Sequence, residues 1–407
     1  MAVTLFENKR DCCGCGACKN VCPREAISMA ADADGFLYPQ IDAQLCVECG
    51  ACQKVCGYQN LPDRSRPIAC YAAAARDEET LKKSASGGMF AVTARKLLEQ
   101  GGVVYGVAMP MEEAGLTARH VRIDSVQALA TLQGSKYVQS DTALIYRQAR
   151  EDLREGRQVL FSGTPCQIAG LLGFLGRKYE NLLTMEVICH GVPSGRMFRD
   201  FLKSLEKRKG SAVAAFAFRT KEKGQGMNTC VNYLGKDGRN AVANRNGHLY
   251  SYMHYFLKSY IYRDNCYSCP FAAAERVADI TIGDYWGFHE EHPVLGRNVK
   301  LSNARGVSCV LLNSENGVRH FEACSHDLTV LATEFEKVAR HNEQLRKPCT
   351  ERKERDVILR LYREQGYSAV EQHFRKTCRK DRAVSVMMDL MPKGLKRTVK
   401  RMIGLVK

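Results

Sequence analysis

After about residue 70, the spacing of apolar residues alternates between a helical period and short continuous runs. Residues 86–102 place apolar side chains such as Met89 and Leu97 on one helical face and end at Gly101–Gly102, which predicts a helix. The next run, VVYGVAM, is apolar throughout and predicts a buried strand. Helices that alternate with strands in this way indicate an α/β body.

Two later strands are expected to end at the same edge of the sheet. Residues 158–162 predict a strand, a helix begins near Gln167, and a second strand ends at Cys189. Two strands joined by so short a helical connection form a right-handed parallel unit, so their carboxyl ends lie side by side. We therefore expect Cys166 and Cys189 at one rim, where open α/β sheets usually bind ligands.

Other segments have weaker patterns. Residues 57–70 contain two prolines and no periodicity, which is typical of a linker. Residues 210–262 show only short strand-like pieces. The segment FAAAERV, at 271–277, is expected to form a short helix before a strand at about 279–283.

The net charge of +16 is distributed unevenly along the 407 residues. Residues 1–60 carry five Lys/Arg and seven Asp/Glu, so by subtraction the remainder carries +18. A body this basic suggests acidic partners: an acidic electron carrier, a phosphate-bearing cofactor, nucleic acid or a membrane surface. Charge alone does not choose among them.

The N-terminus lacks the apolar core of a secretion signal, and the sequence has no run of about eighteen apolar residues. We therefore expect a cytoplasmic protein. Nineteen cysteines in a reducing compartment indicate metal or redox chemistry rather than disulfides.

The cysteines at the start of the chain follow the spacing C-x2-C-x2-C-x3-C twice. In this pattern three thiolates hold one four-iron cluster, and the fourth reaches the other cluster. A structural zinc site, the alternative, normally uses paired C-x2-C knuckles. Cys13 lies outside the spacing and is expected to be a packed or surface thiol, while Gly57 stands where the first motif has Pro23. The predicted ligand sets are Cys12, Cys15, Cys18 and Cys56 for one cluster and Cys46, Cys49, Cys52 and Cys22 for the other.

Cys266 and Cys269 form a further, isolated C-x2-C pair. Cys166 and Cys189 are the other cysteines that the strand pattern places at a ligand-binding edge. From spacing alone, a four-cysteine site built from these residues is as well supported as its alternatives, which are zinc or buried thiols.

Six motifs in order resemble the coenzyme F420 hydrogenase/dehydrogenase beta-subunit family, which is related to the 7-hydroxymethyl chlorophyll a reductases. The resemblance covers about residues 70–320. The motifs are Ser86-Gly87-Gly88, Gly134-Ser135-Lys136-Tyr137, Thr164-Pro165-Cys166-Gln167, Cys189-His190-Gly191, Cys266-x2-Cys269-Pro270, and Ala278-Asp279-Ile280 followed by Gly283-Asp284-Tyr285-Trp286-Gly287.

This resemblance implies FAD and a third four-iron cluster, with Cys166, Cys189, Cys266 and Cys269 at the matching ligand positions. The chain has no G-x-G-x-x-G between a strand and a helix, so a Rossmann-type dinucleotide site is unsupported. Glycines that open a helix can instead present backbone N–H groups to a pyrophosphate. The residues expected to bind FAD are Ser86, Gly87, Gly88, Gly134, Ser135, Lys136, Tyr137 and Trp286. The plain alternative is that Gly87–Gly88 only opens a helix and that Lys136 is a solvated surface residue.

Two further residues are candidates for catalysis. Asp284 directly follows a predicted strand and is expected near the rim of the third cluster. His190 adjoins Cys189 and is expected either to donate a proton to the substrate or to support the cluster by hydrogen bonding. For Asp284 and Trp286, the alternative is a solvent-facing turn with a core tryptophan.

The last 27 residues contain seven Lys/Arg and two Asp, with apolar residues at helical intervals from Leu395 to Val406. This pattern predicts a basic amphipathic helix, which either packs on its own body or makes peripheral contact with an anionic membrane or a partner. Nucleic-acid binding is not expected, because no recognised module accompanies the charge.

The predicted architecture is an α+β ferredoxin-like domain, an α/β body with a largely parallel sheet, and a helical C-terminal tail. The boundaries are 1–60 for the domain with two 4Fe-4S clusters, 61–75 for a linker, 76–325 for the body and 326–407 for the helical basic region.

The predicted function is that of a flavin-dependent iron-sulfur oxidoreductase. We expect it to pass single electrons through the clusters to FAD, for hydride exchange with an organic substrate such as coenzyme F420 or another low-potential acceptor. Expected partners are an acidic carrier such as ferredoxin, or other subunits of a redox complex. The alternatives are a non-catalytic electron-transfer subunit and a ferredoxin-dependent reductase of a polysaccharide-pathway intermediate.

Overall fold

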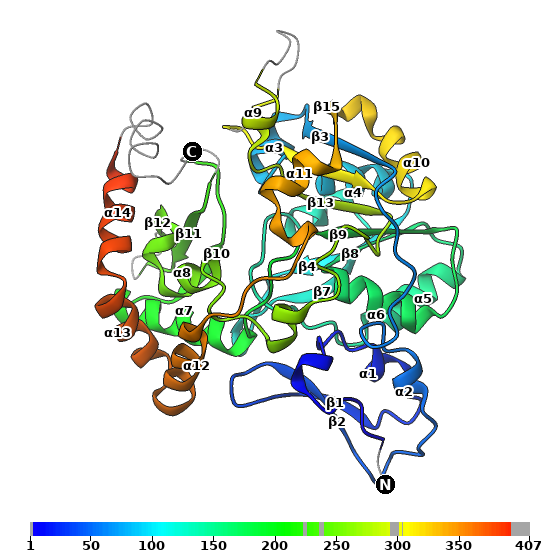
Figure 1. Ribbon diagram of the computed structural model, residues 1–407, viewed down its shortest axis with the longest axis horizontal. Coiled ribbons are helices and arrows are strands. Elements are labelled where there is room, and N and C mark those ends of the chain that lie inside the picture. The colour runs from blue at the N-terminus through cyan, green and yellow to red at the C-terminus, as the bar shows by residue number, and fades with distance from the viewer. Residues whose placement is uncertain (1–2, 223–225, 236–239, 294–300, 303, 392–407) are drawn as a thin grey trace.

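An eight-stranded mixed sheet forms the centre of the body (Figure 1). The computed structural model describes residues 3–222, 226–235, 240–293, 301–302 and 304–391. The strands lie in the order β15-β3-β14-β13-β9-β8-β4-β7. Their bounds are β3 Ala69–Ala75, β4 Val103–Ala108, β7 Arg119–Ile123, β8 Val159–Gly163, β9 Leu182–Val187, β13 Ile280–Asp284, β14 Ser308–Leu312 and β15 Leu328–Thr333.

The predicted parallel strands are confirmed at the centre of this sheet. β4, β8, β9 and β13 pair in parallel, whereas every pairing outside them is antiparallel. Gly163 of β8 lies opposite Glu186 of β9, and Val187 lies opposite Ile282 of β13. Because the three strands end at one edge, the segments that follow them share the predicted rim.

Helices cover both faces of the sheet, and the strands alternate accordingly. In β4, Val104 packs into the core on the side of α4 (Met89–Glu99). Its neighbour Tyr105 packs with α5 (Ile145–Arg154) and α6 (Pro165–Leu175) on the other side. The pattern of residues 86–108 thus predicted both α4 and β4. Other helices of the body are α3 Glu78–Lys83, α9 Phe288–Glu291, α10 Glu315–Ala323 and α11 Phe335–His341.

The sheet extends beyond the predicted body of 76–325 at both ends. β3 lies inside the predicted linker of 61–75, and β15 lies inside the predicted helical region of 326–407. β3 has the sequence ACYAAAA, whose small residues have little strand preference by themselves. Its place between β14 and β15 makes it a strand, and that place depends on residues more than 230 positions away.

The short helix expected at 271–277 is absent from this described segment. Arg276 instead points into the interior, where its Nε donates to Glu186 at 2.6 Å and its Nη1 donates to the carbonyls of Phe271 and Ala273. The backbone of Arg276 pairs with Ser65. A helical backbone would give up these bonds.

Residues 3–60 form a separate head of two short α-helices and a hairpin, drawn in blue in Figure 1. Each helix contains one predicted ligand, Cys18 in α1 and Cys52 in α2. The ferredoxin-like fold of this head stays a prediction. Its elements are η1 Lys9–Asp11, α1 Ala17–Val21, β1 Ile27–Ala31, β2 Leu37–Ile41 and α2 Ala51–Lys54.

A lobe beside the body contains the described residues of the weakly patterned segment 210–262 and the C-terminal helices α12 to α14 (Figure 1). Its three-stranded antiparallel sheet packs through a cluster of aromatic side chains that includes Phe198, Phe201 and Tyr252. Its elements are α7 Gly195–Lys209, β10 Val213–Ala217, β11 Asn228–Tyr233, β12 Ala241–Asn246, α8 Ser251–Leu257, α12 Lys353–Gln365, α13 Tyr367–Thr377 and α14 Arg379–Leu390. The basic helix predicted from Leu395 to Val406 lies outside the described residues.

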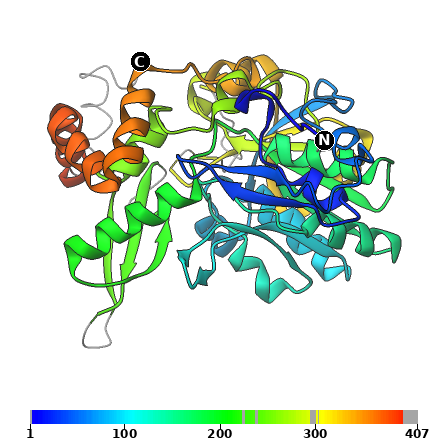
Figure 2. The same cartoon turned by 90° about the horizontal axis from the view of Figure 1, so that it is seen from below.

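The head contacts both the body and the lobe. Figure 2 views the molecule from below, with the head toward the viewer and its hairpin running toward the lobe. At the hairpin turn, the carbonyl of Asp34 accepts a hydrogen bond from Ser194 Oγ at 2.9 Å. On the body, Thr142 Oγ1 donates to the carbonyl of Cys15 at 2.8 Å. None of the described helices is long and apolar enough to cross a membrane.

Candidate functional site

The head gathers its eight motif cysteines around two small cavities, as the crossed spacing predicts. One cavity is lined by Cys12, Cys15, Cys18 and Cys56, together with Cys13 and Cys52. The other is lined by Cys22, Cys46, Cys49 and Cys52. The grouping agrees with the predicted ligand sets, although the ligation itself stays a prediction.

Glycines shape the loops that hold these cysteines. Gly16 and Gly50 have φ values of 76° and 68° at the starts of α1 and α2. This left-handed backbone conformation is unfavourable for residues that have a side chain. The two loops are therefore alike in conformation as well as in spacing. Among the described residues, no group of three or more His, Cys, Asp or Glu side chains is gathered as a single metal ion would require. A four-iron cluster differs in that each thiolate binds its own iron atom.

The four cysteines of the body come together from three segments. Cys166 lies in the first turn of α6, Cys189 follows β9, and Cys266 lies in η4 (Asp264–Ser268), just before Cys269. Burial raises the pKa of Cys189 well above its usual range, and the neighbouring thiols of Cys266, Cys166 and Cys269 raise it further. The thiols are thus close enough to affect one another, as ligands of one cluster must be.

Cys13 links the two cysteine sites, a role that its position outside the spacing did not reveal. Its buried thiol lies close enough to the thiols of Cys15 and Cys166 for each to affect the pKa of the other. These contacts raise the pKa of Cys13 and lower those of the two partners. One side chain therefore spans from the head to the rim of the body.

The helix α6 allows this close approach because the face that meets the head is made of small residues. A Cβ at Gly170 would lie 2.7 Å from Cys15 Sγ, and a Cβ at Gly173 would overlap the carbonyl oxygen of Val55. From the head, Gly57 packs in the same way against Ala169. The helix that carries Cys166 is thus also the docking surface for the head.

A cavity of about 1070 Å³ opens at the rim of the sheet and reaches Cys13, Cys166 and Cys189. It is lined by almost all of the residues predicted for FAD binding and catalysis, although they come from four separate segments. Gly87 is the exception: it does not line the cavity, and its N–H donates to Ser308 Oγ at 2.9 Å. The predicted residues that line the cavity are Ser86, Gly88, Gly134, Ser135, Lys136, Tyr137, His190, Asp284 and Trp286.

Lys136 is not a solvated surface residue. Its ammonium donates to the carbonyls of Leu132 and Gln133 at 2.9 and 2.8 Å, and more weakly to that of Thr131. Burial lowers the pKa of Lys136 to about 7. Since its three N–H groups already have partners, Lys136 holds its own loop in shape and has no donor left for a phosphate.

Asp284 is held by Arg219, a residue that the sequence analysis did not single out. The buried guanidinium of Arg219 binds both carboxylate oxygens, with 3.1 Å between Nη2 and Oδ1. Its centre also lies 5.5 Å from the ring of Trp286. Because Arg219 follows the lobe's strand β10, this ion pair ties the lobe to the rim of the body.

The comparisons with known proteins agree with this arrangement. Residues 70–145 match the family model for the N-terminal part of the coenzyme F420 hydrogenase/dehydrogenase beta subunit, and residues 156–338 match that for its C terminus. The chain belongs to this family. Residues 11–60 match the 4Fe-4S dicluster domain, so the beta-subunit body here follows an iron-sulfur head.

Among solved structures, the present chain is similar to a chain of the F420-reducing NiFe hydrogenase complex from Methanosarcina barkeri. The identity is 15%, the match covers 77% of this chain and 92% of that chain, and the TM-score is 0.40. No curated protein sequence matches the chain.

A hydrogen-bonded chain in this beta-subunit body supports Cys166. Thr164 Oγ1 lies 3.2 Å from Cys166 Sγ and 3.0 Å from Gln167 Oε1, and Gln167 Nε2 donates to Ser140 Oγ at 2.9 Å. The hydroxyl of Ser140 lies 3.2 Å from His120 Nδ1. The Thr-x2-Gln spacing of a capping box could have revealed its first part. The rest joins segments distant in sequence, so spacing could not show it.

Proposed function

We propose that this chain is an iron-sulfur flavoprotein oxidoreductase whose cavity binds FAD and an organic substrate. When bound, FAD would convert the single electrons that clusters carry into two-electron hydride chemistry. Electrons would enter through the clusters of the head, and Cys166, Cys189, Cys266 and Cys269 would hold a third cluster between the head and the cavity.

The main support is that the expected ligand cysteines and the expected flavin residues meet at one cavity. Cys166 and Cys189 line the same space as Ser86, Gly134 and Trp286. Its volume of about 1070 Å³ is at the upper end of the range for small-molecule sites. A cofactor in this space would therefore lie beside the proposed third cluster.

Backbone groups are the best candidates to hold a pyrophosphate here. The cavity reaches the first turn of α4 at Met89, Phe90 and Ala91, where helical N–H groups and the helix dipole favour an anion. Lys136 and Lys221 both donate to backbone carbonyls, Lys221 to those of Leu81 and Ser86. The charges of these two lysines would attract the pyrophosphate without touching it. Backbone amides would donate the hydrogen bonds to its oxygens.

The residues also suggest how a proton would be supplied. His190 lines the cavity, and burial lowers the pKa of its imidazole. A neutral imidazole must take up a proton before it can give one away, so His190 would accept a proton and pass it on to the substrate. Asp284 is bound to Arg219 through both oxygens and would instead position the loop that carries Trp286. We therefore propose His190 for proton donation and Asp284 for positioning.

Purification without oxygen, followed by iron and flavin analysis, tests this proposal. Three clusters require about twelve irons per chain, and replacing Cys266 by Ser should remove about one third of them. A value near eight would eliminate the third site, and an extract without flavin would eliminate the FAD proposal. Reduction by ferredoxin, a deazaflavin and NAD(P)H would then identify the class of electron donor.

A second candidate is an electron-transfer subunit that serves a partner's active site. Both matching family models describe a beta subunit, which is by definition one component of a larger complex. This observation favours a redox complex with partner subunits. In that case the purified chain would contain iron and flavin but would reduce no small substrate until its partner subunits were added. Activity of the isolated chain at rates comparable to the complex would exclude this candidate.

A further inference from the structure

Arg263 is completely buried where the head meets the body, with 0% of its surface exposed. Its backbone N–H donates to the carbonyl of Val192 in the body at 3.0 Å. Its side chain turns to the head, where Nε donates to the carbonyl of Cys12 at 3.0 Å and Nη1 donates to that of Leu37 at 2.9 Å. The guanidinium lies 3.8 Å from the centre of the Tyr38 ring.

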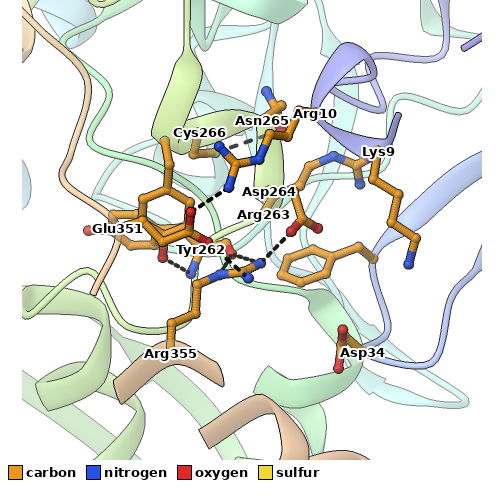
Figure 3. A network of polar contacts seen from close by, with 12 residues as sticks. Lys9, Arg10, Asp34, Tyr262, Arg263, Asp264, Asn265, Cys266, Glu351 and Arg355 are labelled. Atoms are coloured by element: carbon orange, nitrogen blue, oxygen red, sulfur yellow. Dashed lines mark hydrogen bonds and ion pairs between the residues drawn. The ribbon is translucent and has the colours of Figure 1, made fainter. Parts of the chain in front are cut away.

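Within the described part of the chain, no carboxylate forms an ion pair with Arg263. Two of the carboxylates near it, Asp264 and Glu351, are paired with other cations, as Figure 3 shows. Asp264 binds Arg355 at 3.0 Å, and Glu351 binds Arg10 at 2.5 Å. A buried charge without a counterion costs several kcal/mol, so a stable fold needs a negative partner nearby.

The thiols of the two cysteine sites are in a position to provide that negative charge. Nη2 of Arg263 lies 3.8 Å from Cys12 Sγ. A cysteine binds iron as the thiolate, so the predicted ligand Cys12 would carry negative charge beside the guanidinium. The backbone N–H of Cys266, a predicted ligand of the body, donates to the carbonyl of Arg263 at 3.0 Å. The guanidinium therefore lies between the predicted ligands of the head cluster at Cys12 and those of the body cluster.

The backbone of the head is shaped around this guanidinium. A Cβ at Gly14 would lie 3.2 Å from Arg263 Cζ, 2.8 Å from the carbonyl oxygen of Leu37 and 2.7 Å from Gln139 Nε2. Gly14 also has a φ of 68°, so a side chain there would be strained as well as crowded. The cysteine loop thus approaches the cation as closely as a glycine backbone permits.

We propose that Arg263 is the internal countercharge of the electron path and sets the reduction potential of the cluster at Cys12. This inference rests on the ligand assignment of the proposed function. One-electron reduction adds one negative charge to the site and requires no new bond and no proton. A fixed cation in a dry interface stabilises the reduced form and therefore raises the potential, and it does so beside the route from head to body.

The test is a potentiometric titration of the protein under oxygen-free conditions. The electron paramagnetic resonance signal of the reduced clusters monitors the titration. Arg263→Gln should reduce the equilibrium constant for reduction of one head cluster about tenfold, which is a shift of about 59 mV to lower potential. Arg263→Lys, which keeps the charge, should stay within about twofold of the wild type. Arg10→Gln is the matched control, because Arg10 belongs to the same interface but is exposed and already paired.

A second substitution covers the case in which Arg263→Gln loses its iron. Gln139 Oε1 lies 3.5 Å from Nη1 of Arg263, so Gln139→Glu would place a carboxylate beside the guanidinium without changing its size. This variant should also lower the potential. The proposal is overturned if either iron-replete variant keeps the wild-type potentials. Since Cys12 belongs to the head, the result can be read even if iron analysis finds only eight irons and the third cluster is rejected.

Discussion

Gly57 packs so closely on Ala169 that a Cβ at position 57 would overlap the carbonyl oxygen of Ala169. This contact explains why the second cysteine motif ends in glycine where the first has Pro23. The turn after Cys56 lies directly against α6. A feature that looked like a departure from the motif is a docking contact of the head.

Replacing Gly57 by Ala should loosen the head. Since the new methyl group meets backbone rather than a flexible side chain, we expect a destabilisation of about 1–3 kcal/mol. Thermal unfolding and loss of iron on storage would measure it. Gly195→Ala is a suitable control, because a Cβ there meets only the end of Arg199 at 3.4 Å. Equal stability of the two variants would contradict the contact.

Cys13 should prove dispensable for iron binding. Its thiol lies close to Cys15 of the head and Cys166 of the body, but Cys13 belongs to neither of their predicted ligand sets. Cys13→Ser should therefore retain the iron content of the wild type, whereas Cys15→Ser should lower it. A loss of iron from Cys13→Ser as large as that from Cys15→Ser would instead place Cys13 among the ligands.

The buried pair of Arg276 and Glu186 should hold the loop that carries Cys269. Both side chains are almost fully enclosed, and Nη2 of Arg276 lies 2.5 Å from Glu186 Oε1. Arg276→Ala leaves a buried carboxylate without its partner, for which about 3–5 kcal/mol of destabilisation is expected. Chemical denaturation would measure this loss, and iron should fall by about one third.

The double variant Glu186→Met with Arg276→Met provides the control, because it removes both charges and keeps apolar volume. It should be more stable than Arg276→Ala alone. If it is less stable, the charges themselves, and not the lost partner, account for the effect.

His120 should make the protein more sensitive to acid. Burial lowers the pKa of His120 to about 4, below its unfolded value of about 6.5. Between these values the unfolded chain binds about one more proton, so the stabilisation present above pH 6.5 falls by about 1.4 kcal/mol per pH unit as pH drops toward 4. Isothermal denaturation of the wild type and His120→Gln from pH 6.5 to 5 would show a shallower slope in the variant. Equal slopes would mean that His120 titrates normally.

His190 and Asp284 should affect different measurements. His190→Gln should keep iron and flavin while lowering substrate turnover about 10²-fold, as expected for loss of a proton donor. Asp284→Asn should lower the flavin content, because it weakens the tie from Arg219 to the loop of Trp286. The assignment fails if Asp284→Asn keeps its flavin and loses turnover instead.

Several features of the site could be predicted because they depend on neighbours in the chain. The crossed cysteine spacing predicted how the head groups its thiols, since each loop is set by glycines beside its own cysteines. The strands flanking α6 predicted the rim, because a short connection allows only one handedness. The predicted flavin residues were carried over from the family resemblance, and all of them except Gly87 line one cavity.

The sequence alone therefore determined the iron-sulfur head, the α/β body and the rim at which Cys166 and Cys189 meet. The tertiary structure decided the role of each polar group there: Lys136 binds carbonyls, Arg219 holds Asp284, Cys13 lies between two thiol sites, and Arg263 is buried against carbonyls of the head. Tertiary contacts also explain why the alanine-rich segment β3 is a strand and why the segment around Arg276 is not helical. The physical reason is range: spacing and propensity act over a few residues, whereas burial and charge pairing depend on segments that only the fold brings together.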